Sequence, residues 1–292
     1  MQFKEILNLA LKEDIGKGDV TTAALFPGPI RITAKILAKE KGIICGIPVV
    51  EKVFKALDKR IAVIKKVRDG GRVRAGQTIC IVKGDARGIL TGERLALNFL
   101  GRLSGIATLT RKYVERSRPY KVKIMDTRKT TPGLRGLEKY AVKAGGGSNH
   151  RMGLFDQVLI KDNHIKVYSV EFMVYGKKKP SLSRIIEDIR EKIKKGMKIE
   201  IEVENLKQFE EVLKAKPDII MLDNMSIADI KKAVTIKNNL STINYKLSTK
   251  LEASGGITIN NVRNIAKTGV DMISIGALTH SAKSLDLSLE VI

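Results

Sequence analysis

The sequence predicts an α/β protein with two domains, the second of them a (β/α) barrel. At 292 residues the chain is long enough to bury more than one hydrophobic core. After residue 120, six short runs rich in β-branched residues follow one another, and helical segments separate several of them. Strands and helices that alternate every ~20–40 residues are typical of parallel strands joined by helices.

The first hundred residues mix helices and strands. FKEILNLALKED, at residues 3–14, has the apolar spacing of an amphipathic helix. The run at residues 89–117 predicts a long helix, either continuous or interrupted near Gly101 or Gly105. Between these helices lie three strand-like runs, with the turn signal RDGGRVRAG before the last: IRITAKILAK (30–39), RIAVIKKV (60–67) and QTICIVKG (77–84).

The rest of the chain alternates. Its strand-like runs are KVKIMD (121–126), QVLIKDN (157–163), KIEIEVEN (198–205), DIIMLDN (218–224), KLEASGG (250–256) and DMISIGA (271–277). Helices are expected at residues 181–196, 206–216, 225–236 and 258–269. Gly196 is expected to stop the first of these, and Ser226 and Asp229 form a capping box for the third. The polar segment 174–181 predicts a surface loop.

The composition is that of a globular protein outside the membrane. Apolar residues make up 43% of the chain and charged residues 29%, and no run of about 18 apolar residues could form a membrane span. The N-terminus carries acids and lacks a cleavage site, so a cytoplasmic location is expected. Cys45 and Cys80 lie in apolar runs and are expected to be buried, reduced thiols. With only three histidines besides, a zinc site is not expected.

A net charge of +23 raises the possibility of a nucleic-acid partner. The lysines are spread along the chain, however, and aromatic residues, which would stack on single strands, are only 4%. Residues 121–151 hold eight Lys and Arg against Asp126 and Glu138. A concentrated positive field suits a small polyanionic substrate at least as well as a nucleic acid.

Polar or glycine residues end each of the six strand-like runs. In a (β/α) barrel these ends converge on the face where catalysis takes place. Any one of them could be a helix cap or a solvated turn, but six in series favour a site. The residues concerned are Asp126, Arg128, Lys161, Asp162, Glu202, Glu204, Asp223, Asn224, Ser254–Gly256 and Gly276.

The acids and the glycines suggest different ligands. Glu200, Glu202 and Glu204 share a face by strand alternation, and three like charges pointing into a barrel need a cation or ligand hydroxyls. Glu202 and Asp223 carry oxygens of the kind that hold Mg²⁺, although one of these glutamates could simply pair with a lysine. ASGGI and IGALTHS are small-residue turns that let backbone N–H groups approach a phosphate.

A glycine-rich loop at residues 144–149 leads directly into His150 and Arg151. Three consecutive glycines indicate a backbone that lies close to a ligand or to another chain. His150 is either a structural hydrogen-bonding residue or, beside Arg151, part of the site. His164 could hold a turn together, and His280 is expected to be structural.

The stretch DTRKTTPGLRGLEKYAVKAGGGSNHRMGLFDQVLIKDNHI (126–165) closely resembles the signature of the quinolinate phosphoribosyltransferases, also called nicotinate-nucleotide pyrophosphorylases (carboxylating). The similarity covers nearly the whole chain. Further blocks in the family's order are LKEDIGKGDVTT, GERLALNFLGRLSGIAT, EIEVENL, IIMLDN, LEASGGI and DMISIGALTHS. The main departure, VEFMVYGKKKPS (170–181), is longer than expected and lies between the motifs.

The resemblance implies an N-terminal α/β sandwich domain followed by an incomplete (β/α) barrel of about six strands. The sandwich would comprise residues 1–108, joined by the C-terminal tail 281–292, and the barrel residues 109–280. It also implies the family reaction. Quinolinate and phosphoribosyl pyrophosphate give nicotinate mononucleotide, pyrophosphate and carbon dioxide, with Mg²⁺ as cofactor, in de novo NAD synthesis.

The resemblance further implies roles for single residues. Arg128, His150 and Arg151 would hold the quinolinate carboxylates, with Thr127 among the substrate-binding residues. Arg94 resembles an arginine that reaches into the neighbouring subunit's site. The active unit would therefore be a homodimer with shared sites, and a hexamer built as a trimer of dimers stays open.

The remaining roles concern catalysis and the phosphates. Lys129 and Lys161 resemble lysines that face substrate anions, and Glu202 and Asp223 resemble the acids near the ribose hydroxyls and the metal. These four are the expected catalytic residues. The 5′-phosphate cradle would consist of Ser254, Gly255, Gly256, Gly276 and Ala277.

Two other functions remain possible on the sequence alone. A related phosphoribosyltransferase could act on another pyridine or azole acid, although a substrate with one acid group would need fewer cations. An RNA-binding protein without catalytic activity would fit the net charge. Neither nucleic acid nor membrane is the expected partner.

Overall fold

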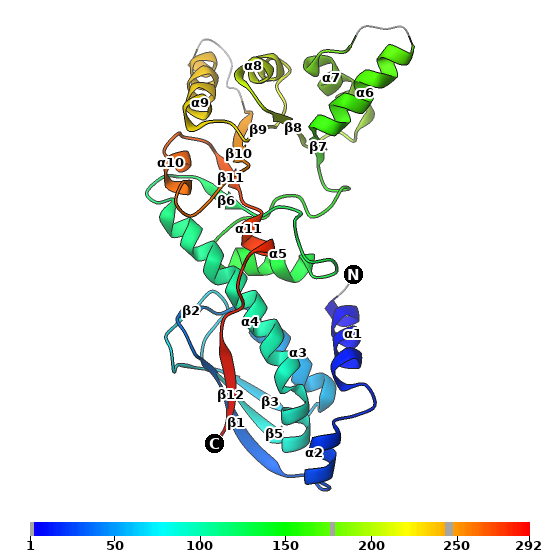
Figure 1. Ribbon diagram of the computed structural model, residues 1–292, viewed down its shortest axis with the longest axis vertical. Helices are drawn as coiled ribbons and strands as arrows, with labels where there is room; N and C mark the ends of the chain where they lie inside the picture. The colour runs from blue at the N-terminus through cyan, green and yellow to red at the C-terminus, as the bar shows by residue number, and fades with distance from the viewer. Residues whose placement is uncertain (1–2, 176–178, 243–247) are drawn as a thin grey trace. The chain divides into compact units, whose positions relative to one another are not determined.

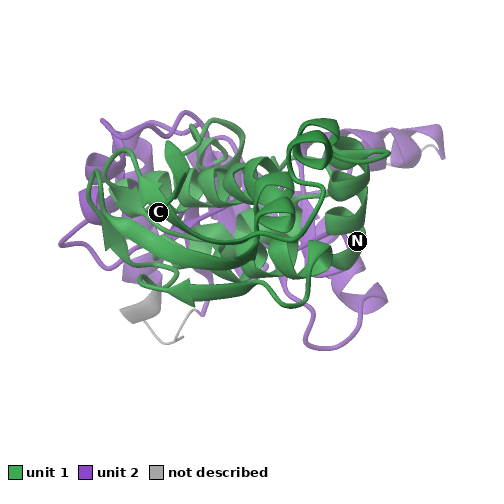
Figure 2. Ribbon diagram, turned by 90° about the horizontal axis from the view of Figure 1, so that it is seen from below, with its two compact units in different colours: residues 1–112, 129–148, 276–292 green, residues 113–128, 149–275 purple. Residues whose placement is uncertain are grey.

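The computed structural model describes residues 3–175, 179–242 and 248–292. The chain forms two compact units, coloured separately in Figure 2. The expected domain boundaries at residues 108/109 and 280/281 stay a prediction. Unit 1 comprises Met1–Lys112, Lys129–Ser148 and Gly276–Ile292, and unit 2 comprises Tyr113–Arg128 and Asn149–Ile275.

Unit 1 contains an antiparallel four-stranded sheet with the order β12-β1-β5-β3. Figure 1 shows the C-terminal strand β12 beside β1, where Ala34 lies opposite Val291. The three strand-like runs of the first hundred residues are therefore confirmed. The bounds are β1 Arg31–Ala38, β3 Ala62–Lys65, β5 Thr78–Asp85 and β12 Leu287–Val291, with a small second sheet of β2 Gly42–Ile43 and β4 Arg72–Val73.

Apolar side chains from this sheet pack against the helices of unit 1. Ile36 and Ile79 come from β1 and β5, Phe54 from α3, and Ile89 and Leu100 from α4, and all five are fully buried. Both cysteines are free and buried, as expected. The helices of unit 1 are α1 Phe3–Ile15, α2 Val20–Leu25, α3 Ile47–Leu57, α4 Ala86–Arg116 up to Lys112, α5 Arg135–Ala144 and α11 Ala277–His280.

Helix α4 is continuous over 31 residues, so an interruption near Gly101 or Gly105 is wrong. The glycines serve close packing instead. A Cβ atom at Gly105 would lie 2.0 Å from the carbonyl oxygen of Lys283, and one at Gly101 would lie 2.9 Å from that of Leu285. The N–H of Leu285 donates to the carbonyl of Gly101 at 3.0 Å. The missing side chains thus admit the chain that leads into β12.

Unit 2 is built on six parallel strands in the order β6-β11-β10-β9-β8-β7. All six strand-like runs form strands. β6 and β7 are the two edges of this sheet, which matches an incomplete barrel rather than a closed one. The bounds are β6 Lys123–Met125, β7 Val158–Ile160, β8 Ile199–Val203, β9 Ile219–Asp223, β10 Lys250–Ser254 and β11 Met272–Ser274.

The expected helices of unit 2 form as α7 Leu182–Lys192, α8 Leu206–Lys214, α9 Ile227–Thr242 and α10 Val262–Ala266. The hydroxyl of Ser226 accepts from the N–H of Asp229 at 3.1 Å, which confirms half of the capping box. The carboxylate of Asp229 accepts from the Ser226 hydroxyl at 2.7 Å rather than from a backbone N–H.

Helix α6 Asp162–Val174 of unit 2 was not predicted, and neither were the helices α2, α3, α5 and α11 of unit 1. The apolar side chains of α6 include Val167, Val170 and Val174, all of which are exposed, so the sequence lacks a clear buried stripe. The predicted loop 174–181 follows it, and residues 176–178 of this loop lie outside the described part of the chain. Across the described residues, no helix combines the length and the apolar character needed to cross a bilayer.

Candidate functional site

One face of the parallel sheet carries buried acids. Strand pairing places Glu202 of β8 and Glu252 of β10 on either side of Met221 in β9, and Glu200 lies two residues before Glu202 on the same face. Glu200 and Glu252 are completely buried. An apolar cluster of Met125, Ile219 and Met272 lies on this face as well. Two carboxylates therefore lie in largely apolar surroundings, where an isolated charge is costly.

The third glutamate of EIEVEN does not belong to this face, so that part of the expectation is wrong. Strand β8 ends at Val203, and Glu204 is exposed beyond it. The backbone N–H of Glu204 donates to the side chain of Gln208 at 2.8 Å. Strand alternation stops where the strand stops, and Glu204 belongs to the turn before α8.

His150 is positioned between the buried acids. Its Nε2 lies 3.1 Å from a carboxylate oxygen of Glu200 and 3.6 Å from one of Glu252. Its backbone N–H donates at 2.9 Å to Asp126, which is buried at the end of β6. The loop that follows the three glycines thus turns inward, because the imidazole provides a partner for carboxylates that the sheet buries.

The hydrogen bonds of His150 fix its tautomer. The backbone N–H of Arg151 donates to Nδ1 at 2.8 Å, so Nδ1 carries a lone pair and Nε2 carries the ring proton. His150, Glu200 and Glu252 place their possible ligand atoms within 4.8 Å of one another, as a metal site would. A protonated Nε2 offers no lone pair to a metal, so we assign the contact with Glu200 to a hydrogen bond.

This trio holds a proton near neutral pH. Burial raises the pKa of Glu200 to about 7, against the opposing hydrogen bond from His150, and the charge of Glu252 adds to the rise. Burial alone would lower the pKa of His150, but the carboxylates of Glu200 and Glu252 outweigh it and raise this pKa. Both shifts have the same direction, so folding favours the protonated state of these neighbouring groups.

Two arginines face the same region of unit 2. Arg151 is buried, and one of its guanidinium nitrogens donates to the carbonyl of Gln157 at 2.9 Å. Burial lowers the pKa of Arg151, and the nearby charge of Arg128 lowers it further. The charges of Glu200 and Glu202 act in the opposite direction. Two guanidinium groups that repel each other in a partly buried place favour an anion between them.

Lys161 and Glu202 meet at the ends of β7 and β8. The ammonium group of Lys161 donates to a carboxylate oxygen of Glu202 at 2.7 Å, and both side chains are partly exposed. The backbone N–H of Lys161 donates to Nδ1 of His164 at 3.0 Å, which gives His164 the turn-holding role that the sequence left open.

The ends of β9 and β10 are tied together next to these groups. The N–H of Asn224 donates to the carbonyl of Ser254 at 2.9 Å, and its side chain donates to Asp223 at 2.9 Å. Gly255 has φ +85°, and a Cβ atom there would lie 2.1 Å from the side-chain oxygen of Asn224. Glycine is therefore required at this turn, which leaves its backbone accessible beside Asp223.

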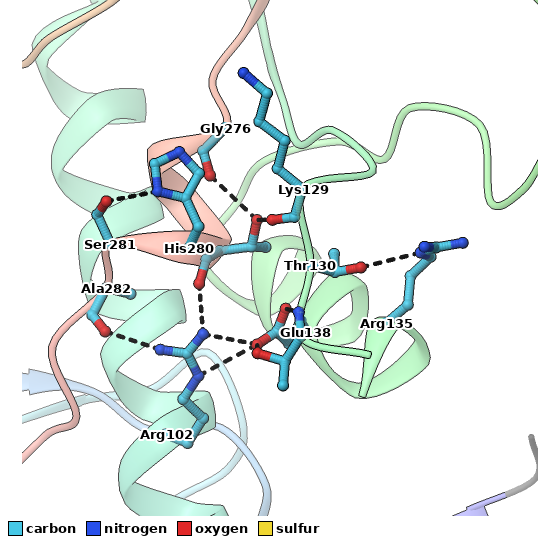
Figure 3. A network of polar contacts seen from close by, with 11 residues as sticks. Arg102, Lys129, Thr130, Arg135, Glu138, Gly276, His280, Ser281 and Ala282 are labelled. Carbon is cyan, nitrogen blue, oxygen red and sulfur yellow. Dashed lines mark hydrogen bonds and ion pairs between the residues drawn. The ribbon is translucent and has the colours of Figure 1, made fainter. Parts of the chain in front are cut away.

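Four other predicted site residues lie in unit 1, namely Arg94, Lys129, Gly276 and Ala277. Gly276 precedes α11, which Ala277 begins, and a Cβ atom on Gly276 would lie 2.9 Å from Cδ of Lys129. Figure 3 shows Lys129 beside the Gly276 turn. Arg94 is exposed on α4. Thr127, in unit 2, is half-buried in the segment between β6 and Arg128.

Comparison with known proteins identifies the family. The sequence profile of the quinolinate phosphoribosyl transferase N-terminal domain matches residues 19–104, and that of the C-terminal domain matches residues 106–290. The chain belongs to the quinolinate phosphoribosyl transferase family.

Similar proteins span the whole chain. It is 41% identical over 291 residues to a probable nicotinate-nucleotide pyrophosphorylase [carboxylating] of Bacillus subtilis, covering 100% of this chain and 94% of the relative. It is 43% identical over 300 residues to quinolinate phosphoribosyltransferase [decarboxylating] 2b, mitochondrial, of Nicotiana tabacum, covering 99% and 82%. The crystal structure of the nicotinate-nucleotide pyrophosphorylase from Ehrlichia chaffeensis has a TM-score of 0.88 at 41% identity, covering 100% and 99%.

Sequence reasoning missed two residues of this candidate site. Glu252 has no hydrogen-bond partner within the described residues and faces His150. Gln157 donates its side-chain N–H to Glu200. Alternation along KLEAS could have placed Glu252 on the face of Ser254, but the role of Gln157 depends on a contact across two strands and leaves no local signal.

Proposed function

We propose that this chain transfers the phosphoribosyl group of phosphoribosyl pyrophosphate to quinolinate, with loss of carbon dioxide, and makes nicotinate mononucleotide for de novo NAD synthesis. It is a phosphoribosyltransferase. The observation that carries the proposal is the pair Arg128 and Arg151, whose like charges act on each other in the same region of unit 2. A substrate with two carboxylates matches this pair of cationic groups.

The planar guanidinium groups can each bind a carboxylate through two hydrogen bonds, which fixes the orientation of the pyridine ring. His150 supports them, because its backbone N–H is held by Asp126 and its ring by Glu200. Lys161 adds a positive charge at the carboxyl end of β7. We infer that these groups present the ring nitrogen toward the sugar, and that this positioning supplies several kcal/mol of the barrier.

Glu202 and Asp223 suit the sugar and Mg²⁺. Both carboxylates are partly exposed, and they lie on one face of neighbouring strands, since Glu202 is opposite Met221 and Asp223 follows two residues later. Hard oxygen ligands of this kind fit Mg²⁺, with substrate phosphates completing its shell. Bound there, Mg²⁺ would offset the charge that develops on the departing pyrophosphate.

The residues of the chain act mainly by binding and by electrostatics. The pyridine nitrogen forms a bond to the anomeric carbon as the bond to pyrophosphate breaks, and the carboxylates of Glu202 and Asp223 stabilise the positive charge on the sugar. The ring nitrogen is then cationic. That positive charge stabilises the electron pair left on the neighbouring ring carbon when its carboxylate departs as carbon dioxide, and a proton then adds to that carbon. No side-chain nucleophile is required.

The phosphate groups are assigned to the backbone turns. Ser254 ends β10 and is followed by Gly255 and Gly256, and Gly276 precedes α11, which Ala277 begins and where Lys129 adds positive charge.

We extend the proposal to a homodimer in which Arg94 enters the partner's site, and to a cytoplasmic location. Arg94 is exposed on α4, so its guanidinium is accessible to a second chain.

One assay tests the function. Quinolinate labelled in the carboxylate next to the nitrogen should release labelled carbon dioxide only when phosphoribosyl pyrophosphate and Mg²⁺ are present, with equal amounts of pyrophosphate. Nicotinate, which has one carboxylate, should be a poor substrate. Faster turnover of nicotinate or of an azole acid would instead favour a related phosphoribosyltransferase.

A further inference from the structure

A ring of polar contacts joins three segments of unit 1 that are far apart in sequence (Figure 3). It starts at Arg102 on α4. The guanidinium donates to Oε1 of Glu138 from Nε at 3.2 Å and from Nη2 at 2.7 Å. It also donates to the carbonyl oxygens of Thr279 and, at 2.9 Å, Ala282. One side chain thus ties α5 to the C-terminal segment.

Glu138 links Arg102 to the segment that follows Lys129. It is fully buried in the first turn of α5, a helix whose N-cap residue, Leu134, makes no capping side-chain hydrogen bond. Its carboxylate accepts the N–H of Thr131 at 3.1 Å and the hydroxyl of Thr131 at 2.9 Å. The chain just after Lys129 is therefore fixed to the start of the helix.

The ring closes on Lys129 itself. The buried hydroxyl of Thr279 lies 2.7 Å from the carbonyl oxygen of Lys129 and 3.2 Å from that of Gly276, and it donates to the nearer one. The side chain of Lys129 passes over Gly276, which has no Cβ atom to obstruct it. Arg102 holds the backbone of Thr279, and Thr279 holds the backbone of Lys129.

The ion pair between Arg102 and Glu138 does more to fix the geometry of the ring than to stabilise the fold. A largely buried ion pair such as Arg102–Glu138 gains little over an apolar pair, because desolvation offsets most of the attraction, whereas loss of one partner is strongly destabilising. Such a pair does fix the orientation of the groups that it joins. The planar guanidinium meets the Glu138 carboxylate and both backbone carbonyls in only one arrangement.

We propose that Arg102, Glu138 and Thr279 are positioning residues that hold Lys129 and the Gly276 turn in place for the phosphate groups of the sugar substrate. This inference rests on the proposed function, which assigns substrate anions to Lys129 and Gly276. None of the three positioning residues needs to touch the substrate.

Thr279→Val tests the inference, because valine keeps the shape, removes the hydroxyl and leaves the carbonyl that Arg102 binds. One lost hydrogen bond of ~0.5–1.5 kcal/mol corresponds to a rise of roughly 2–10-fold in KM for phosphoribosyl pyrophosphate. Binding of quinolinate alone should be unchanged. The matched control is Thr110→Val, which removes a buried hydroxyl on α4 that donates to the carbonyl of Ile106 at 2.8 Å, outside the ring.

A second pair keeps the test decisive if valine impairs folding. Thr279→Ala and Thr279→Ser both lose the methyl group and differ only in the hydroxyl. We expect Thr279→Ser to keep a low KM for phosphoribosyl pyrophosphate and Thr279→Ala to raise it. Hydrogen exchange of the amides in residues 129–134 and 276–280 should be faster in Thr279→Ala than in Thr279→Ser.

Two results would overturn the inference. Thr279→Val could match Thr110→Val in KM, or Thr279→Ala could match Thr279→Ser in both KM and hydrogen exchange. Either result would reduce the ring to a folding element. If the unmodified protein makes no nicotinate mononucleotide, the proposed function fails, and the hydrogen-exchange comparison still tests whether Thr279 holds Lys129.

Discussion

Replacing Glu200 with Gln should flatten the pH dependence of folding stability. Burial raises the pKa of Glu200 from an ordinary value of 4.5 to about 7 in the folded protein. Between these values the folded state binds more protons than the unfolded state, so the free energy of unfolding falls as the pH rises. Stability is therefore highest below the unfolded pKa and is lost as the pH passes through the folded one.

The size of the effect follows from the shift. A change from 4.5 to about 7 is worth ~3 kcal/mol in all at 1.36 kcal/mol per pKa unit, with a slope of about 1 kcal/mol per pH unit near pH 6. Glutamine has the shape of the protonated acid and can accept the Nε2–H of His150, so the variant should fold. The shift of His150 has the same sign, because its folded pKa is also raised.

Urea unfolding at pH 5, 6, 7 and 8, followed by circular dichroism, measures this slope. The unmodified protein should lose stability across the series, and Glu200→Gln should lose much less. Glu187→Gln, the same change at an exposed position on α7, is the control and should keep the original slope. If Glu200→Gln and Glu187→Gln show the same pH dependence, the trio does not hold a proton and the reasoning fails.

Three further predictions concern the site. Arg128→Ala should lower kcat/KM for quinolinate by roughly 10²–10³-fold, the worth of two charge-assisted hydrogen bonds, with an unchanged circular dichroism spectrum; near-normal turnover would refute its role. Arg94→Ala and Arg151→Ala proteins, each inactive, should regain partial activity when mixed, and an absence of rescue in demonstrably mixed dimers would count against a shared site. Gly255→Ala should lower both Tm and activity, because the position combines φ +85° with a collision between the new Cβ atom and Asn224. The control Gly196→Ala, at φ +88° in open space, should lower only Tm. Equal activity of the two variants would contradict the role of Gly255 in phosphate binding.

The alternating pattern made the fold of unit 2 predictable. Each of the six strands is a short β-branched run that ends in polar residues, and this signal is local. Helix α6 gave no such signal, because several of its apolar side chains are exposed. Strand β12 was expected only as a returning tail, since an antiparallel partner 200 or more residues away leaves no trace in its own sequence.

Within the site, the residues found were those at strand ends and in motifs. The charges of Arg128 and Glu202 act on Arg151, and Lys161 pairs with Glu202, while the roles of these residues stay a prediction. The buried partners of His150 were not predicted, because a histidine after a glycine loop gives no indication of whether it points toward ligand or core. The role of Arg102 was not predicted for a similar reason. Its partners come from two segments, α5 and the C-terminal segment, that only the folded chain brings next to α4.

The pairing of β12 with β1 also has a consequence for synthesis on the ribosome. Residues 39–286 must be translated after β1 before its outer neighbour exists, a delay on the order of ten to fifty seconds at ~5–20 residues per second. Throughout that time the nascent chain presents β1 with one row of unsatisfied amides and carbonyls, the kind of edge on which other chains can add a strand. Only the pairing of β1 with β12 closes this edge within the sheet.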